Sequence, residues 1–172
     1  MRIGFVTAEG RGSGDRLLCD LADHLAGRGI RLAGVVQHNT DRARDDGCDM
    51  DVTVLPAGPR LRISQSLGTG SRGCRLDAAA LEQAVGLVGS RLEAGADLLL
   101  VNKFGKHEAE GRGFRDLIGS ALMEGLPVIV GVSARNMAAF REFAGDLAEP
   151  VPADPAALRD WAEAALGAAA AA

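Results

Sequence analysis

Aromatic residues are scarce in this sequence, which has no tyrosine, one tryptophan and five phenylalanines among 172 residues. Proteins that hold single-stranded nucleic acid stack its bases on aromatic side chains, and such platforms are nearly absent here. Basic residues are not in excess either, because 19 of them stand against 23 acidic residues for a net charge of −4. A global positive field for nucleic acid or an anionic membrane is thus missing. We set nucleic acid aside as a partner and expect any anion site to be local.

Cysteine is also scarce, with Cys19, Cys48 and Cys74 widely spaced. A structural zinc site uses Cys or His ligands a few residues apart, and the sequence has no such pair. It also lacks a signal peptide and any apolar run near the ~18 residues of a membrane span. These absences predict a cytoplasmic protein with ordinary thiols, no metal site and no membrane insertion.

Apolar runs alternate with segments of helical spacing along the whole chain. The runs predict buried strands at 2–7, 30–37, 97–101 and 127–132. Helical spacing, caps and glycines predict helices from Asp15 to about 27, from Asp77 to 95, over 114–122, from Ser133 to 145 and from Asp154 to about 165. Such alternation predicts an α/β fold of three layers, α/β/α, with a mainly parallel sheet. The length suits a single domain covering residues 1–172.

Three segments are less regular. Residues 38–51 are polar and predict a surface loop, and 52–55 with 60–64 predict short strands, as in a hairpin at the sheet edge. An exposed sheet edge at 51–65 is compatible with a homodimer, in which two such edges would pair. The glycine-rich stretch 67–75 has either the role of an edge turn or that of a mobile flap.

The stretch "EGRGSGDRLL" (9–18) follows the first strand and leads into the first helix. Glycines before a helix N-terminus can turn successive N–H groups toward a phosphate. Compared with the phosphate-binding pattern G-x-x-x-x-G-K-[ST], Gly14 matches the late glycine, but Asp15 replaces the lysine and Arg16 the hydroxyl residue. The residues that would handle a magnesium nucleotide are therefore missing. Two alternatives remain, a dinucleotide-binding loop and a tight turn with no ligand. The candidate anion-binding residues of this segment are Gly10, Arg11, Gly12, Ser13, Gly14 and Arg16.

The stretch "VNKFGKHEAEG" (101–111) follows another predicted strand, "DLLLV". Ligands of parallel α/β sheets bind at the carboxyl ends of strands, so this stretch and the first glycine loop are expected at the same edge. Residues 74–118 resemble the second half of the thermophilic-type nucleoside-triphosphatases, which are P-loop proteins whose corresponding strand ends in Asp-Glu-x-Gly-Lys-x-Glu. With the loop at 9–18 in register, the resemblance extends over most of residues 1–145. The chain is even more similar to a bacterial domain family of unknown function, often encoded beside molybdate-uptake genes, whose members share "NKFGK.EAEG.GFR".

These resemblances imply a P-loop-NTPase-like fold with altered chemistry. Asn102 stands where the triphosphatases have an Asp associated with magnesium, and Lys103 where they have the Glu that activates water. An amide lacks the charge that holds magnesium, and an ammonium cannot accept a proton at neutral pH. The remaining positions of the motif match, at Gly105, Lys106 and Glu108.

The replacements favour an anion that binds without its metal. Lys103, Lys106, Arg112 and His107 can supply positive charge, while Asn102 and the amides of the first glycine loop can donate hydrogen bonds. Alternatively, Lys103 and Lys106 pair with Glu108 and Glu110 on a solvated turn.

Three alternative functions are consistent with these residues. The first is a non-hydrolytic or weakly active protein that binds a phosphate-bearing ligand, such as a nucleotide, or a tetrahedral oxyanion. Molybdate or tungstate, and a role in molybdenum metabolism, enter through the resemblance alone. The second is a divergent nucleoside-triphosphatase or phosphotransferase, with Glu108 as the candidate catalytic residue. The third is a scaffold whose ancestral pocket no longer binds anything.

Overall fold

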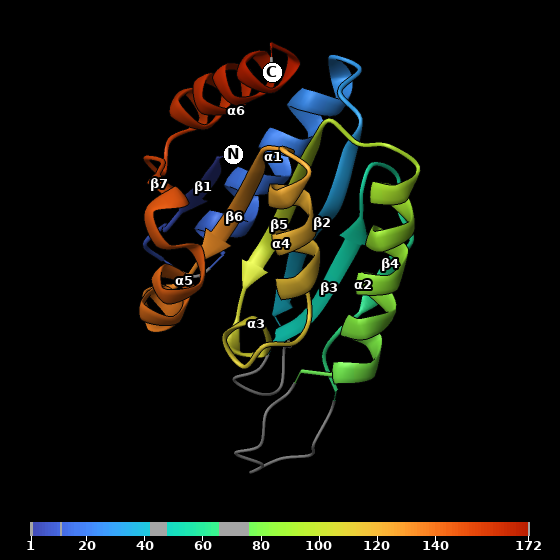
Figure 1. Cartoon of the computed structure of the whole chain (residues 1–172). Coiled ribbons are helices and arrows are strands. Elements are labelled where there is room, and N and C mark those ends of the chain that lie inside the picture. Colours follow the sequence, from blue (N-terminus) through green and yellow to red (C-terminus); the bar gives the residue numbers. More distant parts are fainter. Residues whose placement is uncertain (1, 11, 42–47, 66–75, 172) are drawn as a thin grey trace.

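The fold is built on one sheet with helices on both of its faces (Figure 1). The structure, a computed structural model, describes residues 2–10, 12–41, 48–65 and 76–171. In this part of the chain, seven strands lie in the order β4-β3-β2-β5-β6-β1-β7. Their bounds are β1 Ile3–Val6, β2 Leu32–Asp41, β3 Cys48–Val54, β4 Arg60–Arg62, β5 Leu98–Phe104, β6 Val128–Val132 and β7 Ala148–Pro150.

Most of the sheet is parallel. Strand β5 pairs in parallel with β2 and β6, and β1 pairs in parallel with β6 and β7. Strands β3 and β4 extend the sheet in antiparallel orientation at one edge. The central strands are apolar and buried on both faces, as parallel strands are when helices cover both sides. The predicted α/β class with a mainly parallel sheet is confirmed.

The helices divide into two layers, each with its own apolar core. Helices α1 (Ser13–Gly27) and α6 (Pro155–Ala170) cover one face, where Leu18, Leu25 and Leu158 are buried against the sheet. Helices α2 (Ala78–Glu93), α4 (Arg115–Met123) and α5 (Met137–Ala144) cover the other face. Short helical turns complete the chain, at α3 (Lys106–Ala109), η1 (Ala134–Asn136) and η2 (Gly145–Leu147). Every helix in the described part of the chain is too short or too polar to cross a bilayer.

Two of the predicted helix caps are confirmed and two are wrong. Ser133 was expected to cap the helix that runs to 145, but it precedes the short turn η1 and makes no side-chain cap, and α5 begins at Met137. The Asp77 carboxylate accepts a hydrogen bond from the backbone N–H of Ala80, and Asp154 accepts from Ala156 and Ala157. Asp15 was expected to begin α1, but the helix begins at Ser13 with Gly12 as its N-cap. Asp15 lies inside the first turn instead, where its negative charge complements the positive end of the helix dipole.

The segment expected to be a surface loop, residues 38–51, contains strand residues. Strand β2 continues to Asp41 and pairs with β3 in antiparallel register, with Asp41 opposite Cys48. The polar composition hid this pairing because the paired ends of β2 and β3 are partly exposed, and exposed strand residues need not be apolar. The structure also adds β7 and α3, which the sequence patterns did not indicate. The second glycine-rich stretch, 67–75, lies outside the described residues.

Candidate functional site

The carboxyl ends of β1, β5 and β6 meet at one edge of the sheet, at the lower end of Figure 1 beside α3. Helix α1 follows β1 at this edge, and Asn102 and Lys103 lie near the end of β5 here. The first glycine loop and the strand end at 102 therefore lie at the same edge of the sheet, as predicted.

The turn into α1 depends on glycine. Gly12 has φ 77° and ψ 0°, a left-handed conformation that costs glycine little and other residues more. The Ser13 hydroxyl donates toward two carbonyl oxygens of the turn, Glu9 O at 2.5 Å and Gly10 O at 3.0 Å. The first N–H groups of any helix have no partner inside the helix, so this end of α1 is suited to an acceptor or an anion.

A cavity of about 290 Å³ opens over this turn, and we call it the anion pocket after the ligand class that the sequence predicts at this edge. It is lined by the glycine turn, the ends of β5 and β6, and the hairpin of β2 and β3. The lining residues are Val6, Ala8, Gly10, Gly12, Gly14, Asp15, Gln37, Asn39, Cys48, Met50, Asn102, Lys103, Gly131, Val132 and Ser133. Three of the predicted glycines, the predicted amide and one predicted lysine thus share a single cavity.

A chain of polar side chains crosses the pocket. The Lys103 ammonium lies 3.5 Å from Oδ1 of Asp15, whose Oδ2 accepts a hydrogen bond from the Asn39 amide. Asn39 in turn accepts from the Gln37 amide at 2.8 Å. Asp15 is 8% exposed and Gln37 is 5% exposed, whereas the Lys103 side chain is 39% exposed. Among the described residues, the pocket therefore holds one positive and one negative side chain, with amide groups around them.

Asn102 lies at the wall of the pocket and is 2% exposed. Its amide nitrogen is buried, and no described residue accepts a hydrogen bond from it. On the neighbouring strand Gly131 leaves room for this side chain, because a Cβ at position 131 would lie 3.2 Å from Asn102 Oδ1 and 2.9 Å from a Leu18 methyl. The peptide bond between Asn102 and Lys103 is cis.

Glu108, the candidate catalytic residue, is 3% exposed and does not line the anion pocket. Its Oε2 accepts a hydrogen bond from the Gly105 N–H at 2.8 Å, and its Oε1 accepts from the Phe114 N–H at 3.1 Å. Both carboxylate oxygens are therefore engaged with the backbone on either side of α3. This geometry gives Glu108 the task of holding the connection between β5 and α4 in place.

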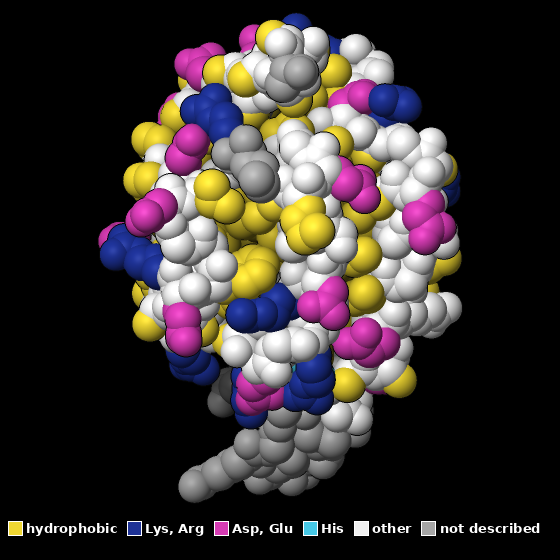
Figure 2. Space-filling model, in the orientation of Figure 1, with side chains coloured by type: hydrophobic (Ala, Val, Ile, Leu, Met, Phe, Trp, Pro, Cys, Tyr) yellow, Lys and Arg dark blue, Asp and Glu magenta, His cyan; other side chains and the backbone are white. Residues whose placement is uncertain are grey.

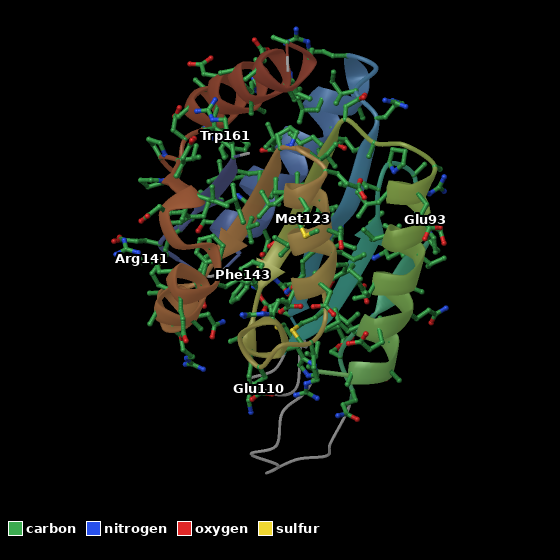
Figure 3. All side chains as sticks on the ribbon, in the orientation of Figure 1. Glu93, Glu110, Met123, Arg141, Phe143 and Trp161 are labelled. Carbon is green, nitrogen blue, oxygen red and sulfur yellow. The ribbon has the colours of Figure 1, made fainter. Side chains whose placement is uncertain are left out.

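Lys106 and Arg112 form ion pairs outside the anion pocket. Lys106 lies 3.5 Å from Glu110, and the Arg112 guanidinium donates to the other oxygen of the same carboxylate. Glu110 lies beside α3 at the lower end of Figure 3. The alternative expectation of a solvated ion pair is met for Lys106 with Glu110. It is not met for Lys103, which lies beside Asp15.

The remaining predicted site residues have separate locations. His107 is 8% exposed and lies at a different cavity, described below. Arg16 is exposed and lines a third cavity, of about 420 Å³, beside the anion pocket. Arg11 lies outside the described residues. Positive and negative side chains are interspersed over the face shown in Figure 2.

Several residues of the pocket were not predicted from the sequence. Gln37 and Asn39 come from the end of β2, and Gly131 with Ser133 from the end of β6. Both strands had been expected, so the rule that ligands bind at carboxyl ends could have pointed to these positions. Asp15 was known as a misfit to the phosphate-loop pattern, but its pairing with Lys103 requires the tertiary structure.

Cys19 lies on α1 at the cavity that Arg16 lines. Burial raises the pKa of its thiol to about 11, with smaller contributions from the negative charges of Asp15, Asp23 and Asp20. The thiol is therefore protonated at neutral pH and is a weak nucleophile. Among the described residues, no three His, Cys, Asp or Glu side chains gather closely enough to hold a metal ion.

Residues 3–161 match a family model described as "Protein of unknown function (DUF2478)". The chain belongs to the DUF2478 family. This match confirms the expected membership in a family of unknown function.

Two further similarities place this DUF2478 protein among other proteins. Over 147 residues it is 35% identical to the molybdenum import ATP-binding protein ModC 2 of Bradyrhizobium diazoefficiens. The matched region covers 86% of this chain but only 16% of ModC 2. The crystal structure of THEP1 from the hyperthermophile Aquifex aeolicus has a TM-score of 0.67 and 17% identity, covering 94% of this chain and 96% of that chain. At this identity the similarity shows the fold alone. It confirms the P-loop-NTPase-like fold that the resemblance to thermophilic-type triphosphatases implied.

Proposed function

We propose that this protein binds a small anion, a phosphate-bearing ligand or a tetrahedral oxyanion, in the anion pocket and without magnesium. The observation that carries the proposal is that the Lys103 ammonium and the glycine turn at the start of α1 border one cavity. A lysine and the positive end of a helix are both well suited to hold phosphate.

The amide side chains of the pocket support the same class of ligand. Gln37 and Asn39 come from the end of β2 and Asn102 from the end of β5, and each can donate hydrogen bonds to the oxygens of an anion. The Asn102 nitrogen has no acceptor among the described residues, and a buried donor without an acceptor is unfavourable. An anion oxygen reached by a small rotation of this side chain would satisfy it.

The pocket is poorly suited to a magnesium ion. Mg²⁺ prefers carboxylates, phosphates and water as ligands, arranged octahedrally. Asp15 is the one carboxylate among the described residues of the pocket, and it is paired with the Lys103 ammonium. A metal ion at Asp15 would stand beside this positive charge. In the proposed function Lys103 takes the place of the metal as the positive partner of the anion.

Among the described residues of the pocket, Asp15 balances the charge of Lys103 and sets a condition on the ligand. An incoming anion has to compete with the Asp15 carboxylate for the Lys103 ammonium. Asp15 keeps its hydrogen bond from Asn39 when Lys103 turns away. The exchange of one negative partner for another favours anions with a charge of −2, which gain more from Lys103 than a carboxylate does.

Molybdate and tungstate are the inorganic ligands that we put first. The support is the 35% identity with a part of a protein whose name assigns it to molybdenum import. This chain spans 16% of that protein, so a role in molybdenum metabolism is our proposal and is not carried over from the relative. A cytoplasmic location and a homodimer stay predictions from the sequence.

Calorimetric titration with phosphate, molybdate, tungstate, ATP and GTP, each with and without magnesium, tests the proposal. We expect at least one tetrahedral anion to bind with a dissociation constant below about 1 mM and with no requirement for magnesium. If none of these ligands binds with a dissociation constant below about 1 mM, a scaffold without a ligand would be favoured. Binding that requires magnesium and leads to nucleotide turnover would favour the divergent nucleoside-triphosphatase or phosphotransferase.

A further inference from the structure

A second cavity, of about 210 Å³, lies on the face of the sheet opposite α1, and we call it the apolar cavity. It is bordered by β3, the start of α2, and the segment from α3 to α4. Its apolar walls come from Met50, Val52, Ile63, Leu76, Leu81 and Phe114. Protein interiors are normally packed with few voids larger than a water molecule. A cavity of this size that keeps an apolar lining is therefore suited to an apolar group from outside.

The apolar cavity adjoins the anion pocket. Four residues line both, namely Gln37, Met50, Asn102 and Lys103. Lys103 suits this border, since its hydrocarbon stem can contact an apolar group while its ammonium remains with the anion. A ligand that crosses the carboxyl edge of the sheet at this border can fill both cavities at once.

His107 adds a specific polar contact to the apolar cavity. The residue is 8% exposed and lines the cavity, and its Nδ1 has no hydrogen-bond partner among the described residues. A buried ring nitrogen without a partner is rare in folded proteins. Depending on the tautomer, Nδ1 can donate to a ligand or accept from it.

We propose that the ligand is a small organic anion whose compact ring occupies the apolar cavity while its phosphate or oxyanion group occupies the anion pocket. An apolar cavity of about 150 Å³ is enough to hold benzene, so 210 Å³ accommodates one ring with a polar substituent or ring nitrogen for His107. The inference rests on the proposed anion site and narrows its ligand, because a free inorganic oxyanion leaves the apolar cavity unused.

Calorimetry with phenyl phosphate and methyl phosphate tests the ring separately from the anion, because the two probes share a phosphate monoester group. We expect phenyl phosphate to bind at least about tenfold more tightly, the effect of burying one ring. Leu76→Trp, which fills the cavity from a half-buried position, should remove this advantage and leave methyl phosphate unchanged. Leu87→Trp is the matched control, since Leu87 is half-buried on α2 and does not line the cavity.

Methyl NMR on the unmodified protein gives a readout that does not depend on any variant. Phenyl phosphate should shift the methyl signals of Val52, Ile63 and Leu81, and methyl phosphate should not. Equal affinity for the two probes, with no shift at these methyls, would overturn the ring proposal and leave the anion site intact. Failure of both probes and of the inorganic anions to bind would contradict the anion site itself.

Discussion

Lys103 and Asp15 lie 3.5 Å apart although 88 positions separate them in the chain. The ammonium comes from the end of β5 and the carboxylate from the first turn of α1, so this pair joins the strand end to the helix that follows the glycine turn. Asp15 stands where the phosphate-binding pattern has its lysine. Lys103 stands where the resemblance to the triphosphatases implies a Glu. Their pairing positions the Lys103 ammonium at the pocket, and the Asp15 carboxylate partly neutralises its charge.

Asp15→Asn should increase affinity for anions. The substitution removes the negative charge that competes for Lys103 and keeps an oxygen that can accept from Asn39. Removal of one unit charge at this distance should lower the dissociation constant about tenfold. Titration with the tightest of the inorganic anions measures the change.

Asp23→Asn is the control for Asp15→Asn, because Asp23 is exposed and lies on the same helix outside the pocket. It should leave anion affinity within about twofold of the original protein. Weaker binding in Asp15→Asn, with unchanged folding, would mean that Asp15 contributes to the ligand site and does not compete with the ligand.

Glu108→Gln should affect stability more than binding. Both oxygens of Glu108 accept backbone N–H groups, and an amide in its place would direct one N–H toward another. We expect the free energy of unfolding to fall by about 2 kcal/mol, the scale for a buried hydrogen bond to a charged group. Urea unfolding measures this change, and Glu110→Gln, at an exposed ion pair, should change stability far less.

The same variant separates a positioning role from a catalytic one. If the original protein hydrolysed a magnesium nucleotide and Glu108→Gln abolished that turnover at unchanged stability, Glu108 would be catalytic and our account of it would be wrong.

Cys19 should react slowly with alkylating reagents at neutral pH. Its pKa is raised to about 11, chiefly by burial, so the thiolate is a small fraction of the residue at pH 8. Alkylation at pH 8 should be about a hundredfold slower than in unfolded protein, where the thiol has an ordinary pKa near ~8.5. The native rate, followed by mass spectrometry of the labelled peptide, should keep rising up to about pH 11. An alkylation rate of the native protein that stops rising at about pH 8.5 would contradict the raised pKa.

Glu149 should make stability depend on acid pH. Hydrogen bonds from Arg2 at 2.9 and 3.0 Å, opposed by burial and assisted by the Trp161 ring N–H, lower the pKa of this carboxyl below its ordinary value of 4.5. A carboxyl with a depressed folded pKa contributes its stability above pH 4.5 and loses it as the pH falls through the folded pKa.

Glu149→Gln therefore should be less stable than the original protein at pH 7, by about 1 kcal/mol for this half-exposed group. The difference should vanish below the folded pKa, where Glu149 itself is neutral. Urea unfolding from pH 7 to pH 3 measures it, with Glu142→Gln as an exposed control. A difference that grows in acid would contradict the assigned direction.

The layers of the fold and the neighbourhood of the two loops could be predicted because they depend on local patterns. Apolar runs predict the buried strands, and Asp77 and Asp154 signal helix starts through their own side chains. That the two loops meet then follows from the general rule that ligand-binding segments lie at the carboxyl ends of parallel strands, whereas the order of the strands was not predicted.

The composition of the pocket could not be predicted in the same way. Lys103, Lys106 and Arg112 all bring positive charge to one short stretch of sequence, yet of the three only Lys103 lines the anion pocket, because Lys106 and Arg112 pair with Glu110. Glu108 likewise could be read as an acid or base until its two backbone partners are known.

Anion affinity of Lys103→Ala against Lys106→Ala tests the central claim most directly. The two lysines are three positions apart, and one lines the anion pocket while the other lies outside it, paired with Glu110. We predict at least a tenfold weaker binding of the tightest inorganic anion for Lys103→Ala and a change within about twofold for Lys106→Ala. Equal effects of the two substitutions, or unchanged binding in Lys103→Ala, would contradict an anion site built on Lys103 and the glycine turn.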